Sequence, residues 1–216
     1  MTKTRPNHIL KWCLAPTLYI SDTYKKAASS LNDRGRRVRR LNKIYLTISI
    51  VLYIIVNLMC IQPKGTVLEK FLLIFLPLWT LSRANEIFLA FIKDVFDKLD
   101  LKKRNKNGLE YHERIHMALR SFVELTIHYA NLYFLLDTYY LQYGLAASLF
   151  NQKLEEPFTA LYFSLMTITS IGYGDYYPIH PLARGLVMYE VITGFLLLAV
   201  SFTVYVGLNL DEKEAP

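Results

Sequence analysis

Residues 167–178 read T-I-T-S-I-G-Y-G-D-Y-Y-P, and they lie between a short apolar run and a long one. Gly172 and Gly174 permit backbone dihedrals that residues with a side chain rarely adopt, so successive carbonyl oxygens can face one side. A line of such oxygens replaces the water around a dehydrated cation. The segment therefore predicts cation coordination by backbone atoms. Since Gly and Asp are also common in turns, the alternative is an ordinary turn.

The segment resembles the filter loop of the potassium-channel pore family, with Ser170 and Ile171 where Thr and Val usually stand. The resemblance extends from about residue 160 to residue 207. It implies potassium as the permeant ion, no cofactor and no enzymatic activity. It also implies that ions bind along the filter, at Ser170, Ile171, Gly172, Tyr173 and Gly174. Serine keeps the hydroxyl of threonine but lacks its stiff β-branched torsion, so we expect potassium selection with a looser innermost site.

The resemblance also assigns a group of filter-supporting residues, which are Tyr162, Phe163, Met166, Thr169 and Asp175. Tyr162 and Phe163 stand where the family often has two tryptophans, and Met166 stands where some bacterial members carry glutamate. Phe163 has no hydrogen-bond donor, whereas the Tyr162 hydroxyl can donate to the Asp175 carboxylate, and such charge-assisted bonds are strong. We therefore expect Tyr162 alone to hold Asp175.

Gly194 matches the inner-helix glycine at which such channels bend, so the resemblance implies a gating hinge there. A glycine within a membrane helix can equally serve close packing between helices. Both interpretations stay open at the level of sequence.

Four apolar segments and one short re-entrant helix must position this filter. Over 216 residues, 53% are hydrophobic and the mean hydropathy is +0.21, which favours an integral membrane protein. We predict an all-α membrane protein with spanning helices at residues 44–61, 71–92, 117–140 and 182–210, a pore helix at 157–169 and the filter at 170–175.

The predicted spans divide the chain into five parts. These are a basic tail (1–43), a two-helix peripheral unit (44–92), a linker (93–116), a pore domain (117–210) and a short tail (211–216).

Lysine and arginine collect in two segments, with eleven in residues 1–43 and eight in residues 93–120. Because short basic loops stay in the cytoplasm, both termini are expected there, with the filter facing outward across the plasma (inner) membrane. The cluster Arg34–Arg40 suits anionic lipid better than nucleic acid, since it lies a few residues before a span.

Several ionisable residues interrupt the predicted spans. Glu124, His128 and Asn131 recur on one helical face, and Arg83 and Glu86 lie one turn apart in the preceding span. We expect Arg83 and Glu124 to meet at one depth, either in a structural polar seam or in a sensor centred on His128. Glu190, four residues before Gly194, is a further intramembrane acid. The candidate residues of the polar seam or sensor are therefore Arg83, Glu86, Glu124, His128, Asn131 and Glu190.

One filter segment encloses nothing, so rings of carbonyls imply a homotetramer with cyclic symmetry. A single intramembrane arginine, Arg83, in the first two spans predicts weak voltage dependence. The chain ends six residues after Leu210, which leaves no room for a ligand-binding regulatory domain there.

Two other classes of function remain possible from the sequence. A non-conducting subunit that assembles with another channel would carry the same sequence. His112, Glu113 and His116 match the zinc-peptidase pattern H-E-x-x-H, although the sequence offers no persuasive third ligand.

Overall fold

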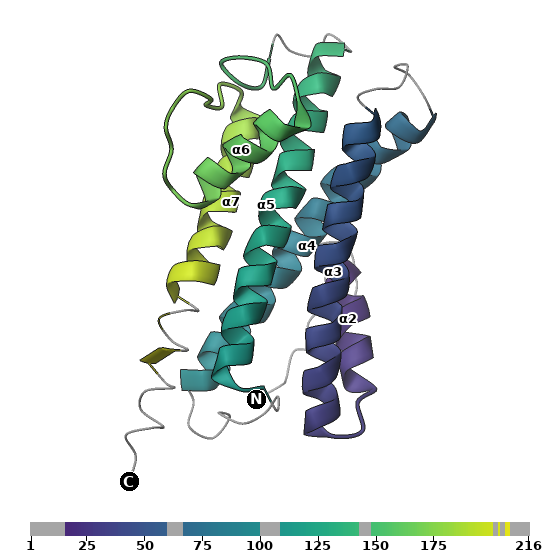
Figure 1. Cartoon of the computed structure of the whole chain (residues 1–216), viewed down its shortest axis with the longest axis vertical. Helices are drawn as coiled ribbons and strands as arrows, with labels where there is room; N and C mark the ends of the chain where they lie inside the picture. Colours follow the sequence, from purple (N-terminus) through teal and green to yellow (C-terminus); the bar gives the residue numbers. More distant parts are fainter. Residues whose placement is uncertain are drawn as a thin grey trace, which may run out of the picture.

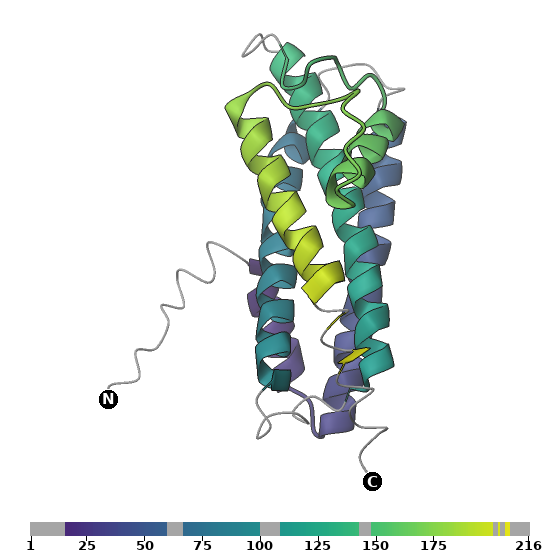
Figure 2. The ribbon, with the colours of Figure 1, turned by 90° about the vertical axis from the view of Figure 1, so that its left-hand side faces the viewer.

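The structure is a computed structural model that describes residues 16–59, 67–99, 109–142, 148–200, 203 and 206–207. In this part of the chain the regular elements are all helical, as expected. The α-helices are α2 (Pro16–Lys26), α3 (Leu31–Met59), α4 (Val67–Leu99), α5 (Tyr111–Gln142), α6 (Pro157–Ile168) and α7 (Pro181–Phe195). The long helices α3, α4, α5 and α7 run side by side along the long axis, and α6 lies at the end of the bundle where α5 ends and α7 begins (Figure 1; Figure 2).

Three helical segments are long and apolar enough to cross a membrane, namely Leu31–Leu58, Lys70–Asp97 and Pro181–Ala199. Helix α5, the fourth expected span, is not among them because it carries too many polar residues. It is nevertheless the central helix, in contact with α3, α4, α6 and α7. Its polar side chains face the interior, where Glu124, His128, Asn131 and Asp137 are fully buried.

On the side away from α6 the helices extend beyond the predicted membrane spans. Helix α3 begins at Leu31 instead of residue 44, α4 continues to Leu99, and α5 begins at Tyr111. Residues assigned to the basic tail and the linker therefore form helical turns. Hydropathy marks where a helix leaves an apolar environment and not where it ends, and arginine and lysine are good helix formers.

Ion pairs hold these additional turns together. Arg39 of α3 pairs with Glu113 of α5, and Arg114 of α5 pairs with Asp94 of α4. Asn42 donates to the Ser121 hydroxyl at 2.9 Å. The three helices are thus fastened to one another at the end of the bundle opposite α6.

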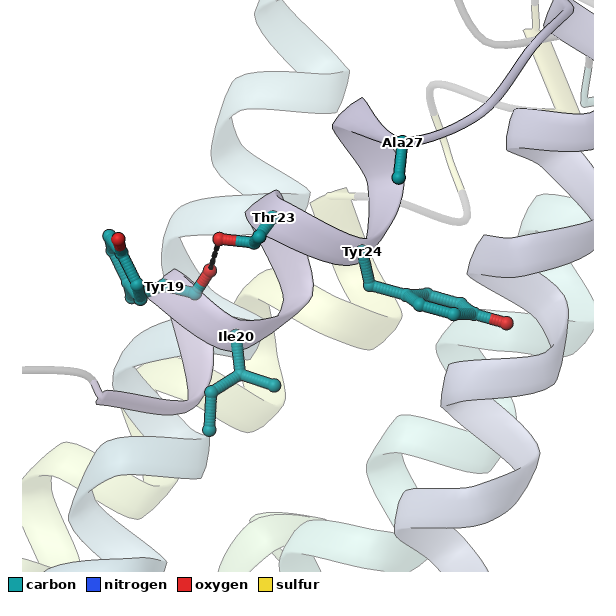
Figure 3. Close-up of a pocket in the computed structure, with 5 residues that line it drawn as sticks. All are labelled: Tyr19, Ile20, Thr23, Tyr24 and Ala27. Carbon is teal, nitrogen blue, oxygen red and sulfur yellow. Dashed lines mark hydrogen bonds between the residues drawn. The ribbon is translucent and has the colours of Figure 1, made fainter.

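Helix α2 packs against α4 and α3. Its buried face carries Thr17, whose hydroxyl lies 2.8 Å from that of Ser82. Its outer face forms a shallow pocket, shown in Figure 3, in which Tyr19 and Ile20 point away from the bundle. Tyr24 instead lies under the guanidinium of Arg37 of α3, 4.9 Å from the ring centroid. A polar inner face and a partly apolar outer face therefore distinguish this helix.

The predicted inner helix (182–210) is not one continuous α-helix. Helix α7 ends at Phe195 and is followed by a π-helical turn, η2 (Leu196–Val200). Such turns widen the backbone spiral and are common points of bending. Beyond it, residues 203 and 206–207 are helical, whereas 208–210 and the expected tail 211–216 lie outside the described residues.

Candidate functional site

The segment predicted as the filter (170–175) begins where α6 ends, in a helix-terminating Schellman motif. The Ser170 N–H donates to the Thr167 carbonyl at 2.9 Å, and the Ile171 N–H donates to the Met166 carbonyl at 3.0 Å. This motif requires a left-handed residue, usually glycine, and Ser170 takes that conformation with φ of 59°. For a residue with a side chain this costs about 1–2 kcal/mol.

Left-handed residues recur at every second position of the filter. After Ser170, Gly172 has φ of 54° and Gly174 has φ of 81°. An added Cβ at either glycine would meet no atom within 4 Å in the single chain, so the positive φ is what requires glycine there. Alternation of this kind turns successive peptide planes so that their carbonyl oxygens can line one side of the chain.

The filter lies open on the surface of the single chain. Tyr173 is 72% exposed and Ile171 is 53% exposed, although both are large and apolar for the most part. The described residues therefore leave one side of the filter uncovered.

The residues expected behind the filter are placed in two groups. The Tyr162 side chain interacts with that of Asp175, and its ring lies 6.4 Å from that of Tyr176. Phe163 instead points into the core, where its ring lies 5.2 Å from that of Tyr133 and 5.0 Å from that of Phe150.

The other two expected support residues contact the filter region through the end of α6. Met166 supports the filter through its backbone, since its carbonyl also accepts the Gly172 N–H at 3.1 Å. The Thr169 hydroxyl donates to the Leu165 carbonyl at 2.6 Å.

Asp175 is also held through its backbone, whereas the expectation that Tyr162 alone holds its carboxylate stays a prediction. The backbone carbonyl of Asp175 accepts hydrogen bonds from Asn151 at 2.9 Å and Gln152 at 3.0 Å. Both residues lie in the segment before α6, and this segment is itself bound to the buried Asp137 of α5. Sequence reasoning missed these residues because no motif marks them; the only signal was an acid in an apolar helix.

Glu190 of α7 joins three helices behind the filter. Its Oε2 accepts the Tyr133 hydroxyl of α5 at 2.7 Å, and its Oε1 lies 2.5 Å from the Ser164 hydroxyl of α6. All three residues are buried, with at most 1% of each exposed. Glu190 is therefore not part of the cluster around Arg83, contrary to the grouping made from sequence.

The hydrogen-bond donors around Glu190 indicate the protonation state of its carboxyl group. The single Ser164 hydroxyl proton faces two acceptors, Glu190 Oε1 and the Thr126 carbonyl oxygen, which lies 2.9 Å away. With the carboxyl protonated, Glu190 donates to Ser164 and Ser164 donates to Thr126, so every contact has one donor. With a carboxylate, one of these two contacts would bring two acceptor oxygens together with no proton between them, which is unfavourable.

Gly194 lies against the end of α6. An ideal Cβ there would overlap Ile168 Cγ1 and lie 3.0 Å from the Ile168 carbonyl oxygen. This contact gives Gly194 a packing role, and η2 begins two residues later. The hinge interpretation stays a prediction.

Arg83 is the centre of a second buried polar cluster. Its Nε donates to Glu124 at 2.8 Å and a terminal nitrogen donates to Glu86, so the pair expected from depth is in direct contact. The guanidinium also lies 3.5 Å from the Tyr45 ring centroid. Tyr45 comes two residues after Lys43, so Arg83 lies level with the charged start of the first predicted span.

The rest of the expected seam is not joined into one network. His128 Nε2 is 3.7 Å from Glu124 Oε1, which is too long for a hydrogen bond. Among the described residues neither ring nitrogen of His128 nor either amide atom of Asn131 has a hydrogen-bond partner. The arginine is thus fully engaged, whereas the histidine and the asparagine are not.

The zinc-peptidase pattern lies at the opposite end of α5. Glu113 is engaged by Arg39 and by the Glu110 N–H, and His112 lies 3.1 Å from Glu110. The rings of His112 and His116 are 6.4 Å apart. No group of three metal-ligating side chains gathers within the described ranges.

Comparisons with known proteins point to one family. Residues 126–209 match the family described as Ion channel. The voltage-gated potassium channel Kch of Escherichia coli (strain K12) is 38% identical over 58 residues, which cover 27% of this chain and 14% of that protein. The inward rectifier potassium channel Kirbac3.1 of Paramagnetospirillum magnetotacticum is 33% identical over 106 residues, covering 48% of this chain and 35% of that protein. No solved structure matches the chain.

These matches confirm the resemblance to the potassium-channel pore family for the C-terminal part of the chain. The chain spans about a third or less of the length of the two relatives.

We expect Gly194→Ala to destabilise the protein, because the new methyl group must displace Ile168 and the end of α6. Overpacking of this kind costs about 1–3 kcal/mol. Thermal unfolding of the purified protein in detergent should show a lower midpoint. The matched control is Gly185→Ala in the same helix, where an added Cβ meets nothing within 4 Å. Equal midpoints for the two variants would contradict the packing role.

We expect Glu190→Gln to be tolerated and Glu190→Leu to be destabilising. Glutamine has one acceptor and one donor group, as a protonated acid does, whereas leucine leaves two buried hydroxyls without this partner, at a cost of about 1–3 kcal/mol. Unfolding midpoints of both variants measure the difference. If Gln and Leu lower the midpoint equally, Glu190 is not a neutral acid.

Proposed function

We propose that this chain, whose residues 126–209 match the ion-channel family, forms a potassium-selective channel in which ions pass along the backbone carbonyls of residues 170–174. The observation that carries the proposal is the filter backbone, with positive φ at Ser170, Gly172 and Gly174. Carbonyl oxygens on one side of such a segment can replace the hydration shell of a potassium ion. The Ser170 hydroxyl would complete the innermost site.

A tetramer of identical chains would enclose the pore. The exposure of Tyr173 and Ile171 supports this assembly, because both side chains would be covered by neighbouring copies. Helices α6 and α7 also expose apolar side chains, including Phe158 at 69%, Met188 at 65% and Phe195 at 63%. Surfaces of this kind suit a partner chain or lipid.

The proposed membrane arrangement has α3, α4, α5 and α7 as four spans, with α6 as the re-entrant pore helix. The basic ends of α3 and α5 would lie in the cytoplasm with both termini, and the filter would open outward across the plasma membrane. Arg34–Arg40 would then lie near anionic lipid headgroups.

The cluster around Arg83 argues against strong voltage gating. Its guanidinium is bound to both Glu124 and Glu86, and breaking a buried pair costs about 3–5 kcal/mol. One charge moved through the full field contributes only about 2.3 kcal/mol per 100 mV. We therefore assign Arg83, Glu86 and Glu124 to holding α4 and α5 together.

We expect the purified protein, reconstituted alone in liposomes, to carry potassium current whose reversal potential follows the potassium gradient. Gly174→Ala should abolish the current, because a side chain is strained at φ of 81°. Gly185→Ala is the control, since it adds the same methyl group at an open helical position. Equal permeability to sodium would refute the selectivity, and absence of flux would favour a non-conducting subunit.

We expect Tyr162→Phe to shorten the time for which the filter stays conductive. The change removes only the hydroxyl group that interacts with the Asp175 side chain. Single-channel open times measure the effect. Tyr176→Phe is the matched control, because its ring packs edge-on against Tyr162. Unchanged open times in the Tyr162 variant would contradict a role of Tyr162 in supporting the filter.

A further inference from the structure

Residues 148–154, which precede α6, form an exit bracket along the chain that leaves the filter. The Leu149 carbonyl accepts the Ile179 N–H at 3.0 Å and the His180 N–H at 3.2 Å. The Asn151 N–H donates to the Tyr177 carbonyl at 3.0 Å. The bracket therefore fixes the path of residues 177–180 by backbone hydrogen bonds.

Two side chains of the exit bracket reach the filter itself. Asn151 Nδ2 and Gln152 Nε2 both donate to the Asp175 backbone carbonyl, at 2.9 and 3.0 Å. Asn151 Oδ1 also accepts the Tyr177 N–H at 2.8 Å, so this amide uses both of its ends. A backbone carbonyl has two lone pairs, and here both face the bracket. The Asp175 carbonyl is thereby withdrawn from cation coordination, and the series of available carbonyls ends at Gly174.

The exit bracket is held from inside by one carboxylate. Asp137 Oδ1 accepts the Leu149 N–H at 3.0 Å and the Ser148 hydroxyl at 3.2 Å, and Oδ2 accepts the Leu154 N–H at 3.0 Å. Asp137 is fully buried. These contacts join both ends of the bracket to one side chain of α5, and bonds to a charged acceptor are about twice as strong as neutral ones.

An aromatic contact fixes the middle of the exit bracket. Phe150 is fully buried, and its ring lies 5.7 Å from that of Tyr133 and 5.0 Å from that of Phe163 of α6. The bracket therefore has a defined position relative to the pore helix as well as to α5. An error in its register would displace Asn151 and Gln152 from Asp175.

We propose that Asp137 is a positioning residue for the filter exit, and that it acts through the 148–154 bracket to fix the Asp175 carbonyl away from the ion path. This inference rests on the proposed potassium-channel function. Asp137 of α5 would thus support the filter, a role that Phe163 does not fill. Asp137 itself touches no ion; Asn151 and Gln152 transmit its effect.

The test compares three variants in liposomes by reversal potential and by the decay of current at low external potassium. Asp137→Asn keeps the volume but places an N–H group opposite one of the bracket donors. The double variant Asn151→Ala/Gln152→Ala removes, at exposed positions, the two contacts to Asp175 together with the contact between Asn151 and the Tyr177 N–H. Lys153→Gln, at the next exposed position, is the control.

We expect Asp137→Asn and the double variant to lower the potassium-to-sodium permeability ratio and to speed the decay, with no additional change when the two are combined. Lys153→Gln should keep the wild-type ratio and decay. Hydrogen exchange at the Tyr177 and Ile179 amides should be faster in Asp137→Asn.

A conducting wild type whose double variant keeps the wild-type ratio and decay would overturn this inference alone. The same holds if the effects of Asp137→Asn and the double variant add. A wild type without potassium flux would overturn the proposed function, and the inference would fall with it.

Discussion

The carbonyl of Met166 accepts two filter amides, and the geometry of the whole site depends on this interaction. It ends α6 and starts the filter in one step, so the filter can only be as well placed as the helix. Helix α6 is fixed by Ser164 against Glu190, by Phe163 within the aromatic core and by Ile168 against Gly194. Each of these contacts therefore acts on the filter without touching an ion.

Two buried polar clusters stabilise their ionisable side chains in different ways. Arg83 is balanced by carboxylates and an aromatic face, which keeps the charges and neutralises them locally. Among the described residues the Glu190 carboxyl group hydrogen-bonds with hydroxyl groups alone, so its burial is least costly when it carries a proton. The first cluster joins the peripheral helices α3 and α4 to α5, whereas the second joins α5 to α6 and α7. A buried acid in this chain cannot be interpreted without its partners.

Helix α6, the positive φ of Gly172 and Gly174 and the contact between Arg83 and Glu124 could be predicted from sequence, because each follows from a local motif or from residue spacing. The role of residues 148–154 could not, since it depends on Asn151 and Gln152 meeting a carbonyl more than twenty positions away. Glu190 was recognised as unusual but given the wrong neighbours, because helix depth restricts a residue's partners only to those at its own level. The full length of the helices could not be predicted from the apolar runs, because charged turns continue past them.

The ion pairs at the end of the bundle opposite α6 have a mechanical consequence. Arg39 with Glu113 and Arg114 with Asp94 fasten α3, α4 and α5 into one rigid body there. Among the described residues none of these ion pairs reaches the chain beyond Phe195, which continues as the wider turn η2. At this end η2 therefore meets the frame of three helices through packing, with Leu197 fully buried, and not through these charges.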